Sequence, residues 1–327
     1  MSNVNESAIR IRPYAAEDEE QVSDTLVQGF RTVTDPVFFR RIKHYSTLFS
    51  ILIKSVLFSS LLELALTAYF SSKIVASSPL SFAGLFWDTL NSFLDALMRP
   101  ESTQSLIKQF LRPSFILIWV VVTLVVAAFA LVDIHRWAVS SNTKYVENCF
   151  EDDLGDIHAY YQTQSLTNGR KNRSQFWVAC LDSHPQLVLG CIALDDNWAH
   201  EEYMKKRFLA RGRKNAKFEA PSKTDGEMRR LSVHPNYQRL GISKRLIDAV
   251  VEYATKSGFK TLSFTTTYHQ PIAIANYIRY GFVKVKSSKR AKFIDLWHGT
   301  MNLYATDEDK EEQHSRRGEM LREIGAL

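Results

Sequence analysis

Cysteine is scarce in this chain, with 3 among 327 residues. The spacing matches neither a metal site nor a disulfide framework, so we expect free thiols in a reducing compartment at Cys149, Cys180 and Cys191. Metal-ligand spacing is also missing among the histidines, so no metal is expected and no role is assigned to His200, His234, His269 and His298. Residues 1–24 are polar and acidic, unlike a signal peptide, and internal repeats are not apparent. The formal net charge of +6 is modest, and we expect no nucleic-acid partner.

Two common nucleotide-binding patterns are also missing: the P-loop G-x-x-x-x-G-K-[ST], and the three glycines of a dinucleotide fold. What is present is Leu231–Lys244, whose pattern predicts a strand, a turn at His234-Pro235, a glycine-bearing loop and a helix start. Such a loop directs backbone N–H groups toward one concave spot, where the helix dipole also favours pyrophosphate oxygens. Gly241 matters because a Cβ there would hold the phosphate away from the backbone.

The residues that follow predict a helix, a strand and a second helix. Apolar residues recur at helical spacing from Gln238 to Lys256, and Gly258 suits the left-handed position that ends a helix. Thr261–Thr266 is β-branched and alternating, which indicates a strand. A second helix is expected at about Pro271–Tyr280.

Two motifs in this order resemble those of the GCN5-related N-acetyltransferase (GNAT) superfamily. Gln238-x-x-Gly241-x-Ser243 is similar to its acetyl-CoA loop, Gln/Arg-x-x-Gly-x-Gly/Ala, with Ser243 in place of Gly or Ala. The second motif, Asn-x-x-Ala-x-x-Leu-Tyr-x-x-x-Gly-Phe, is matched at Ala273, Tyr277, Gly281 and Phe282, whereas the Asn and Leu are replaced by Gln270 and Asn276. The resemblance implies an α/β (α+β) acyl-CoA transferase fold, with a mixed central sheet and a splayed strand pair.

The resemblance implies acetyl-CoA as the cosubstrate. The residues expected to bind it are Leu231, Ser232, Val233, Gln238, Arg239, Leu240, Gly241, Ile242, Ser243, Lys244, Gln270 and Asn276. In this fold the strand Glu227–Val233 splays away from Thr261–Thr266, and the pantetheine pairs with the free backbone like an added strand. An N–H at Leu231 or Val233 is then expected to face the thioester carbonyl.

Two catalytic residues are implied in the same way. Glu227 lies fourteen residues before Gly241, the position of the general-base glutamate in the superfamily's lysine acetyltransferases. Tyr277 matches the tyrosine that protonates the departing CoA thiolate. The alternatives are a solvated carboxylate at a strand start and an aromatic side chain in the core.

Arg229 and Arg230 are candidates for the acceptor site. Because they are adjacent in a strand, we expect their side chains on opposite faces, with Arg229 on the face of Glu227. A guanidinium there can grip an acceptor carboxylate with two hydrogen bonds. Pairing with a neighbouring acid is an equally good interpretation.

A membrane hairpin is expected within this fold. Ser114–Val132 is nineteen residues without a charge, nearly enough to cross a hydrocarbon core of about 30 Å. Leu48–Phe70 is a second candidate, although it contains Lys54 and Glu63. Residues 9–13 and 176–304 resemble parts of one sheet and must lie on the same side of a bilayer, so both segments are expected to span. The distribution of basic residues favours a cytosolic location for both ends.

These expectations divide the chain into four parts. They are residues 1–44, the first strand and helices of the GNAT domain; 45–136, the hairpin with spans at about 48–70 and 114–132 and an amphipathic connector at 79–99; 137–304, the main catalytic part with an insertion at 195–226; and 305–327, a charged tail. Within the insertion, the basic stretch 201–217 is interpreted as a solvated flexible loop.

A GNAT domain interrupted by a hairpin resembles the membrane-bound cysteine-S-conjugate and aspartate N-acetyltransferases. Thr143–Val146, residues 151–157 and Phe176–Ala179 resemble stretches of that subgroup. The resemblance implies an enzyme of the endoplasmic reticulum that acetylates a small amine bearing a carboxylate. The partners are then this amine and the lipid bilayer. Protein lysine acetylation and a catalytically silent acyl-CoA-binding membrane scaffold remain as alternatives.

Overall fold

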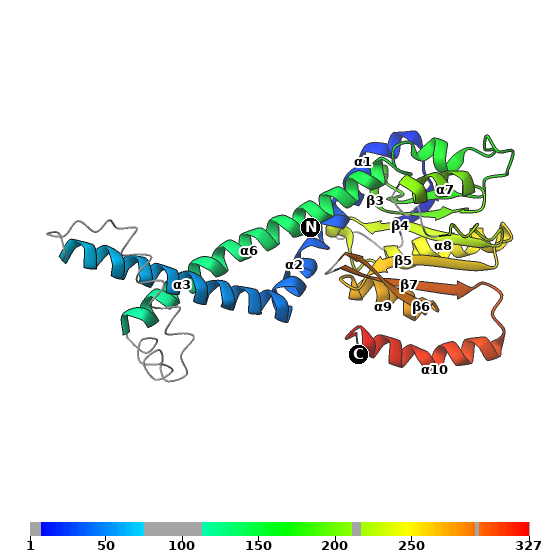
Figure 1. The fold of residues 1–327 in the computed structure, drawn as a ribbon. Coiled ribbons are helices and arrows are strands. Elements are labelled where there is room, and N and C mark those ends of the chain that lie inside the picture. Colours follow the sequence, from blue (N-terminus) through cyan, green and yellow to red (C-terminus); the bar gives the residue numbers. More distant parts are fainter. Residues whose placement is uncertain (1–7, 75–112, 211–216, 292–293, 327) are drawn as a thin grey trace. The chain divides into compact units, whose positions relative to one another are not determined.

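The computed structural model describes residues 8–74, 113–210, 217–291 and 294–326 (Figure 1). The chain forms two compact units, Met1–Val37 with Val139–Leu327, and Phe38–Ala138. The connector expected at 79–99 lies outside the described residues.

The first unit is built on a sheet that contains seven strands among the described residues, in the order β1-β2-β3-β4-β5-β7-β6. The strands are β1 (Ile9–Pro13), β2 (Gln175–Leu181), β3 (His184–Asp195), β4 (Asp225–Val233), β5 (Thr261–Thr267), β6 (Val283–Ala291) and β7 (Ile294–Asn302). In Figure 1 they can be followed side by side from β3 through β4 and β5 to β7. The helices and short helical turns of this unit are η2 (Ala16–Asp18), α1 (Glu19–Arg31), the π-helical turn η4 (His158–Gln162), α7 (Glu201–Ala210), η5 (Pro235–Tyr237), α8 (Ile242–Lys256), α9 (Pro271–Tyr280) and α10 (Asp307–Glu323).

The sheet is mixed, because β4 and β5 are parallel whereas the other neighbours are antiparallel. The β4–β5 pairing ends at Met228 and Phe264, although the strands run on to Val233 and Thr267. The predicted splayed pair is therefore confirmed. β1 pairs with β2 from Ile9 opposite Leu181 onward, so the N-terminal segment and the segment after α6 share one sheet, as expected.

Each face of the sheet has its own apolar core. On one face, α8 and α9 contribute buried residues such as Leu246, Val250 and Ile278, and Met228 of β4 points to the same side. On the other face, α1 and η4 pack through Leu26 and Tyr161. The charged tail is helical as α10, and its Met320 and Leu321 are buried in the first core.

A bulge in β4 changes the direction of its side chains. β3 pairs Cys191 with Ser232 and Ala193 with Arg229, so two residues of β4 oppose one residue of β3. Arg230 takes a left-handed φ of 58° at this point. The extra residue breaks the alternation, and both arginines reach Asp153, with Arg230 Nε donating at 2.9 Å and Arg229 Nη2 lying 3.5 Å from it. The prediction that Arg229 and Arg230 face opposite sides is therefore wrong.

The interpretation of 201–217 as a flexible loop is wrong for its first ten residues, which form α7. Glu201 and Glu202 in the first turn and Arg207 in the last complement the helix dipole. Side chains also tie the helix to the turn at residues 151–154, since Tyr203 and Arg207 both contact Asp152. Residues 211–216 lie outside the described part of the chain.

The second unit is formed by long apolar helices. α2 (Thr34–Lys43) leads into α3 (Tyr45–Ile74), and α6 (Pro113–Phe150) runs on without interruption past the predicted end of the second span. Tyr45–Leu62 and Ile116–Phe150 are each long and apolar enough to cross a membrane. Large apolar side chains on both helices are exposed, for example Leu57, Phe58, Leu124 and Phe129.

Candidate active site

The loop before α8 has the backbone geometry of an anion receptor. Arg239 and Gly241 have φ values of 67° and 69°, so the chain turns twice through the left-handed region before the helix begins at Ile242. Such turns expose successive backbone N–H groups on one side, next to the free amides of the first helical turn. A Cβ built on Gly241 would meet no atom within 4 Å, so the space beside this glycine is open. The loop therefore fits a pyrophosphate at the position that the sequence predicts.

The side chains of this segment point in several directions. Within the loop, Gln238 and Arg239 are exposed and Leu240 is half-buried. Ile242, the first residue of α8, is buried in the core. Ser243 is half-buried, and Lys244 pairs with Asp248 at 2.8 Å. On β4, Leu231 and Val233 are half-buried, while Ser232 turns to the α1 face, where its hydroxyl donates to the Thr25 carbonyl at 3.0 Å.

Glu227 and Tyr277 flank the point where β4 and β5 separate. Glu227 belongs to the second-last β4–β5 pair, and its neighbour Met228 faces the α8 core, so the carboxylate lies on the α1 face. Asn197 Nδ2 donates to Glu227 Oε2 at 3.2 Å. Tyr277 comes from the opposite face, where its ring stacks on Phe264 with 3.7 Å between the centroids. The two predicted catalytic residues thus stand on either side of the opening between the strands.

The phenol of Tyr277 is held in its protonated form. The residue is 6% exposed, and burial raises its pKa well above the ordinary value. Of the other two predicted residues on or next to α9, Gln270 caps the helix and accepts a hydrogen bond from the Thr266 hydroxyl at 2.6 Å. Asn276 is exposed.

Both candidate arginines of β4 are engaged by aspartates. Arg229 Nη1 donates to Asp195 at 2.7 Å, and Arg230 forms two hydrogen bonds with Asp153. Burial alone would raise the pKa of Asp153, but the charges of Arg229 and Arg230 outweigh it and lower that pKa. The pairing with neighbouring acids is thus the arrangement in the structure.

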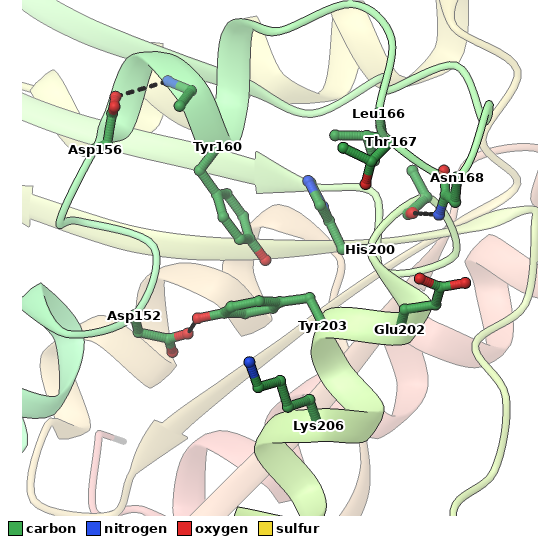
Figure 2. A pocket seen from close by; sticks show the side chains of 12 residues that line it. Asp152, Asp156, Tyr160, Leu166, Thr167, Asn168, His200, Glu202, Tyr203 and Lys206 are labelled. Atoms are coloured by element: carbon green, nitrogen blue, oxygen red, sulfur yellow. Dashed lines mark hydrogen bonds between the residues drawn. The ribbon is translucent and has the colours of Figure 1, made fainter.

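A pocket of about 600 Å³ lies on the same face as Glu227 (Figure 2). The pocket is lined by η4, by α7, and by the segments just before and after η4 and just before α7. Its residues are Asp152, Asp156, Ala159, Tyr160, Leu166, Thr167, Asn168, Ala199, His200, Glu202, Tyr203 and Lys206. Asp195 connects the pocket to the strand opening, because it pairs with Glu227 in the β3–β4 register and contacts His200 and Arg229. We call this the η4–α7 pocket.

The motifs in the sequence did not indicate the residues of this pocket. Asp195 ends β3, and His200 precedes α7 by one residue, so only the fold brings them together with Tyr160. In the sequence, the local indication of this site was the spacing of five residues between Asp195 and His200, between a strand end and a helix start.

The comparisons with known proteins agree with this geometry. Residues 131–282 match the model of the acetyltransferase (GNAT) family. This stretch of the chain is similar to the GNAT family. The matched stretch includes Glu227, the Gly241 loop and Tyr277. A comparison with curated proteins gave no match.

Several solved structures are similar at low identity. A GNAT acetyltransferase from Staphylococcus aureus Mu50 shares 19% identity at a TM-score of 0.32, covering 46% of this chain and 76% of its own. A GCN5-related N-acetyltransferase from Kribbella flavida shares 14% at a TM-score of 0.34, with the same coverage of 46% and 76%. A Salmonella typhimurium protein, solved with its cofactor acetyl-CoA, shares 15% at a TM-score of 0.30, covering 41% and 67%. Because each of these structural similarities is low, the similarity to the GNAT family rests on the family match over residues 131–282.

Proposed function

We propose that this protein is a membrane-anchored, acetyl-CoA-dependent N-acetyltransferase whose acceptor is a small amine bearing a carboxylate, such as a cysteine S-conjugate or an amino acid. The observation that carries the proposal is the position of Glu227 and Tyr277 on either side of the β4–β5 opening, behind a loop shaped for pyrophosphate. A GNAT domain with this arrangement has both the anion receptor and the proton-transfer groups that acetyl transfer needs.

Each residue has a defined task in this proposal. The Gly241 loop holds the pyrophosphate through backbone N–H groups. An N–H of Leu231 or Val233 donates to the thioester oxygen, because β5 no longer pairs with this part of β4. Glu227 takes a proton from the acceptor ammonium, directly or through water, and Tyr277 supplies the proton that the CoA thiolate needs on departure.

Membrane anchoring is proposed from the second unit. Exposed Leu, Val, Ile and Phe side chains along α3 and α6 form continuous apolar surfaces, which lipid stabilises better than water does. Because β1 and β2 pair, the chain must return to the side from which it left, which favours a hairpin. We propose the endoplasmic reticulum, with the catalytic domain and both termini cytosolic; tags at the two termini are then equally accessible to protease outside sealed vesicles.

The η4–α7 pocket is proposed as the acceptor site, since Asp195 links it to Glu227. With Arg229 and Arg230 held by aspartates, Lys206 becomes the candidate for binding the acceptor carboxylate. Lys206 lines the pocket, and no residue of the described part of the chain forms an ion pair with it.

The test is acetyl transfer by membranes that contain the full chain. Labelled acetyl-CoA is offered with S-benzyl-L-cysteine, aspartate or a lysine-containing peptide as acceptor. We expect label on the amine of a small acceptor. Label on the peptide alone would rule out the small-amine proposal, and intact CoA binding without any transfer would favour a silent scaffold.

Replacing Tyr277 by phenylalanine is expected to lower turnover by roughly 10²-fold, because the substitution removes the proton donor and leaves the stacking on Phe264 in place. Acetyl-CoA affinity, measured by equilibrium dialysis, should stay within about 2-fold, since the pyrophosphate loop is untouched. Unchanged turnover would reject the proton-donor role.

Replacing Lys206 by methionine is expected to raise KM for S-benzyl-L-cysteine by roughly 3- to 10-fold, because an exposed ammonium–carboxylate pair is lost. The KM for S-benzylcysteamine, which has no carboxylate, should not change. Lys205→Met is the matched control, since Lys205 is exposed on the same helix but does not line the pocket. An equal rise with both acceptors would contradict carboxylate recognition by Lys206.

A further inference from the structure

His200 carries a buried nitrogen without a partner. The residue is 6% exposed, and its Nδ1 lies 3.0 Å from Asp195 Oδ1. Its Nε2 is buried and has no hydrogen-bond partner among the described residues. A buried nitrogen of this kind can accept a hydrogen bond that no described residue supplies, and a ligand with an N–H or O–H group can supply it.

The surroundings of His200 decide which of its nitrogens carries hydrogen. Burial alone would raise the pKa of Asp195, but the hydrogen bond from His200 and the charge of Arg229 outweigh it and lower that pKa. Asp195 is therefore an ionised acceptor, which places the imidazole hydrogen on Nδ1. In the neutral form of this tautomer, Nε2 presents a lone pair that can accept a hydrogen bond.

The ring of His200 is part of the wall of the η4–α7 pocket. Tyr160 stacks on it at 4.2 Å between centroids and fixes its plane. Figure 2 shows His200 between Tyr160 and the segment that contains Leu166 and Thr167. Asp195, which holds Nδ1, also holds Arg229, the first residue of β4 beyond the last β4–β5 pair. The carboxylate of Asp195 thus connects the imidazole of His200 to the place where β4 separates from β5.

The charges around the pocket favour a cation at this nitrogen. Three carboxylates, those of Asp152, Asp156 and Glu202, line the pocket together with one ammonium, that of Lys206. Asp152 is paired with Arg207 and Arg229, which leaves Asp156 and Glu202 against Lys206. These carboxylates and the tyrosine rings that line the pocket attract ammonium groups. An ammonium has N–H donors and no acceptor, which is the complement of a bare Nε2.

We propose that Nε2 of His200 accepts a hydrogen bond from the ammonium group of the acceptor, which makes His200 the amine-recognition residue of the η4–α7 pocket. Asp195 is its positioning residue. That this ammonium belongs to the acceptor rests on the proposed acetyl transfer. That His200 binds an ammonium group does not depend on it. It assigns to His200 a role distinct from that of Glu227, which acts on the proton rather than on the position of the amine.

The test measures binding rather than turnover. Purified full-length protein in detergent, without acetyl-CoA, is titrated calorimetrically with S-benzyl-L-cysteine and with 3-(benzylthio)propionic acid, which has the same skeleton but no amine. His200→Asn is expected to weaken binding of the first probe about 10- to 100-fold and to leave the second within about 2-fold. Asparagine can still donate to Asp195, so the fold around Asp195 is preserved while the Nε2 acceptor is removed.

Two further variants complete the design. His200→Gln can place an amide oxygen near the Nε2 position and is expected to keep most of the affinity. His184→Asn, at an exposed histidine outside the pocket, should bind both probes as the wild type does. Equal weakening of both probes by His200→Asn, unchanged binding of both, or failure of the wild type to bind S-benzyl-L-cysteine would overturn the proposal. Acetyl transfer by the wild type would stand in each of these cases, which separates this inference from the proposed function.

Discussion

Replacing Asp153 by alanine is expected to lower the free energy of unfolding by about 3–5 kcal/mol, because the buried guanidinium of Arg230 would lose the carboxylate that holds it. Asp153 is fully buried, and Arg230 and Arg229 are 5% and 11% exposed. Tyr161 also donates its hydroxyl to Asp153 from within the α1-side core. In the alanine variant Arg229 keeps its hydrogen bond to Asp195. Arg230 loses both of its hydrogen bonds to Asp153, and the buried hydroxyl of Tyr161 loses its acceptor.

The measurement is urea unfolding of the full chain in detergent, followed by hydrogen exchange of backbone amides in β2, β3 and β4. Asp182→Ala is the matched control, since Asp182 pairs with Arg10 at the surface, where both side chains are more than half exposed. It is expected to change stability by less than about 1 kcal/mol. Similar losses in the two variants would show that the Asp153 cluster is no more important than a surface pair.

The same cluster predicts how stability depends on pH. The pKa of Asp153 is lower in the folded protein than in the unfolded chain, because the charges of Arg229 and Arg230 outweigh the cost of burial. Its contribution is therefore present above the ordinary carboxyl pKa of about 4 and is lost as the pH falls below that value. We expect the stability difference between wild type and Asp153→Ala to shrink in this acid range, and a difference independent of pH would contradict the ion-pair account.

The elements around the Gly241 loop could be predicted from the sequence because their determinants are local. A helical stripe specifies α8, and glycine supplies the left-handed residues at 241 and 258 without steric cost. α9 was predicted with its observed bounds, since Pro271 marks its start and Gly281 follows its end. These local features were enough to predict the loop and the region that holds Tyr277.

The contacts that join Arg230 to Asp153 and Tyr160 to Asp195 could not be predicted, because these residues lie far apart in the chain. Arg230 meets Asp153 across 77 positions, and Tyr160 meets Asp195 across 35. The bulge that turns Arg230 toward Asp153 depends on the register between β3 and β4, and nothing in the local pattern of β4 requires it. His200 was therefore left without a role, although the fold makes it the buried wall of the η4–α7 pocket.

Replacing Glu227 by glutamine is expected to lower kcat/KM for a small amine acceptor by roughly 10²- to 10⁴-fold near neutral pH. Glutamine has nearly the same shape, and its amide oxygen can still accept the hydrogen bond from Asn197. What disappears is the ability to take a proton from the acceptor ammonium. Glu252→Gln is a suitable control, because Glu252 is an exposed glutamate that pairs with Lys256 on α8.

The pH dependence of this deficit separates a general base from a carboxylate that only orders the site. As the pH approaches the pKa of the acceptor amine, a growing fraction of acceptor arrives without its extra proton and no longer needs Glu227. The ratio of wild-type to Glu227→Gln activity should therefore fall steadily with rising pH. A purely structural role gives a constant ratio, since the contacts of Glu227 on the sheet do not depend on the protonation of the acceptor.

Binding separates the proposed roles of His200 and Glu227, because His200 is proposed to act on affinity for the amine and Glu227 on its proton. Glu227→Gln should therefore leave the calorimetric binding of S-benzyl-L-cysteine within about 3-fold of the wild type, the change expected for an exposed or partly exposed charge.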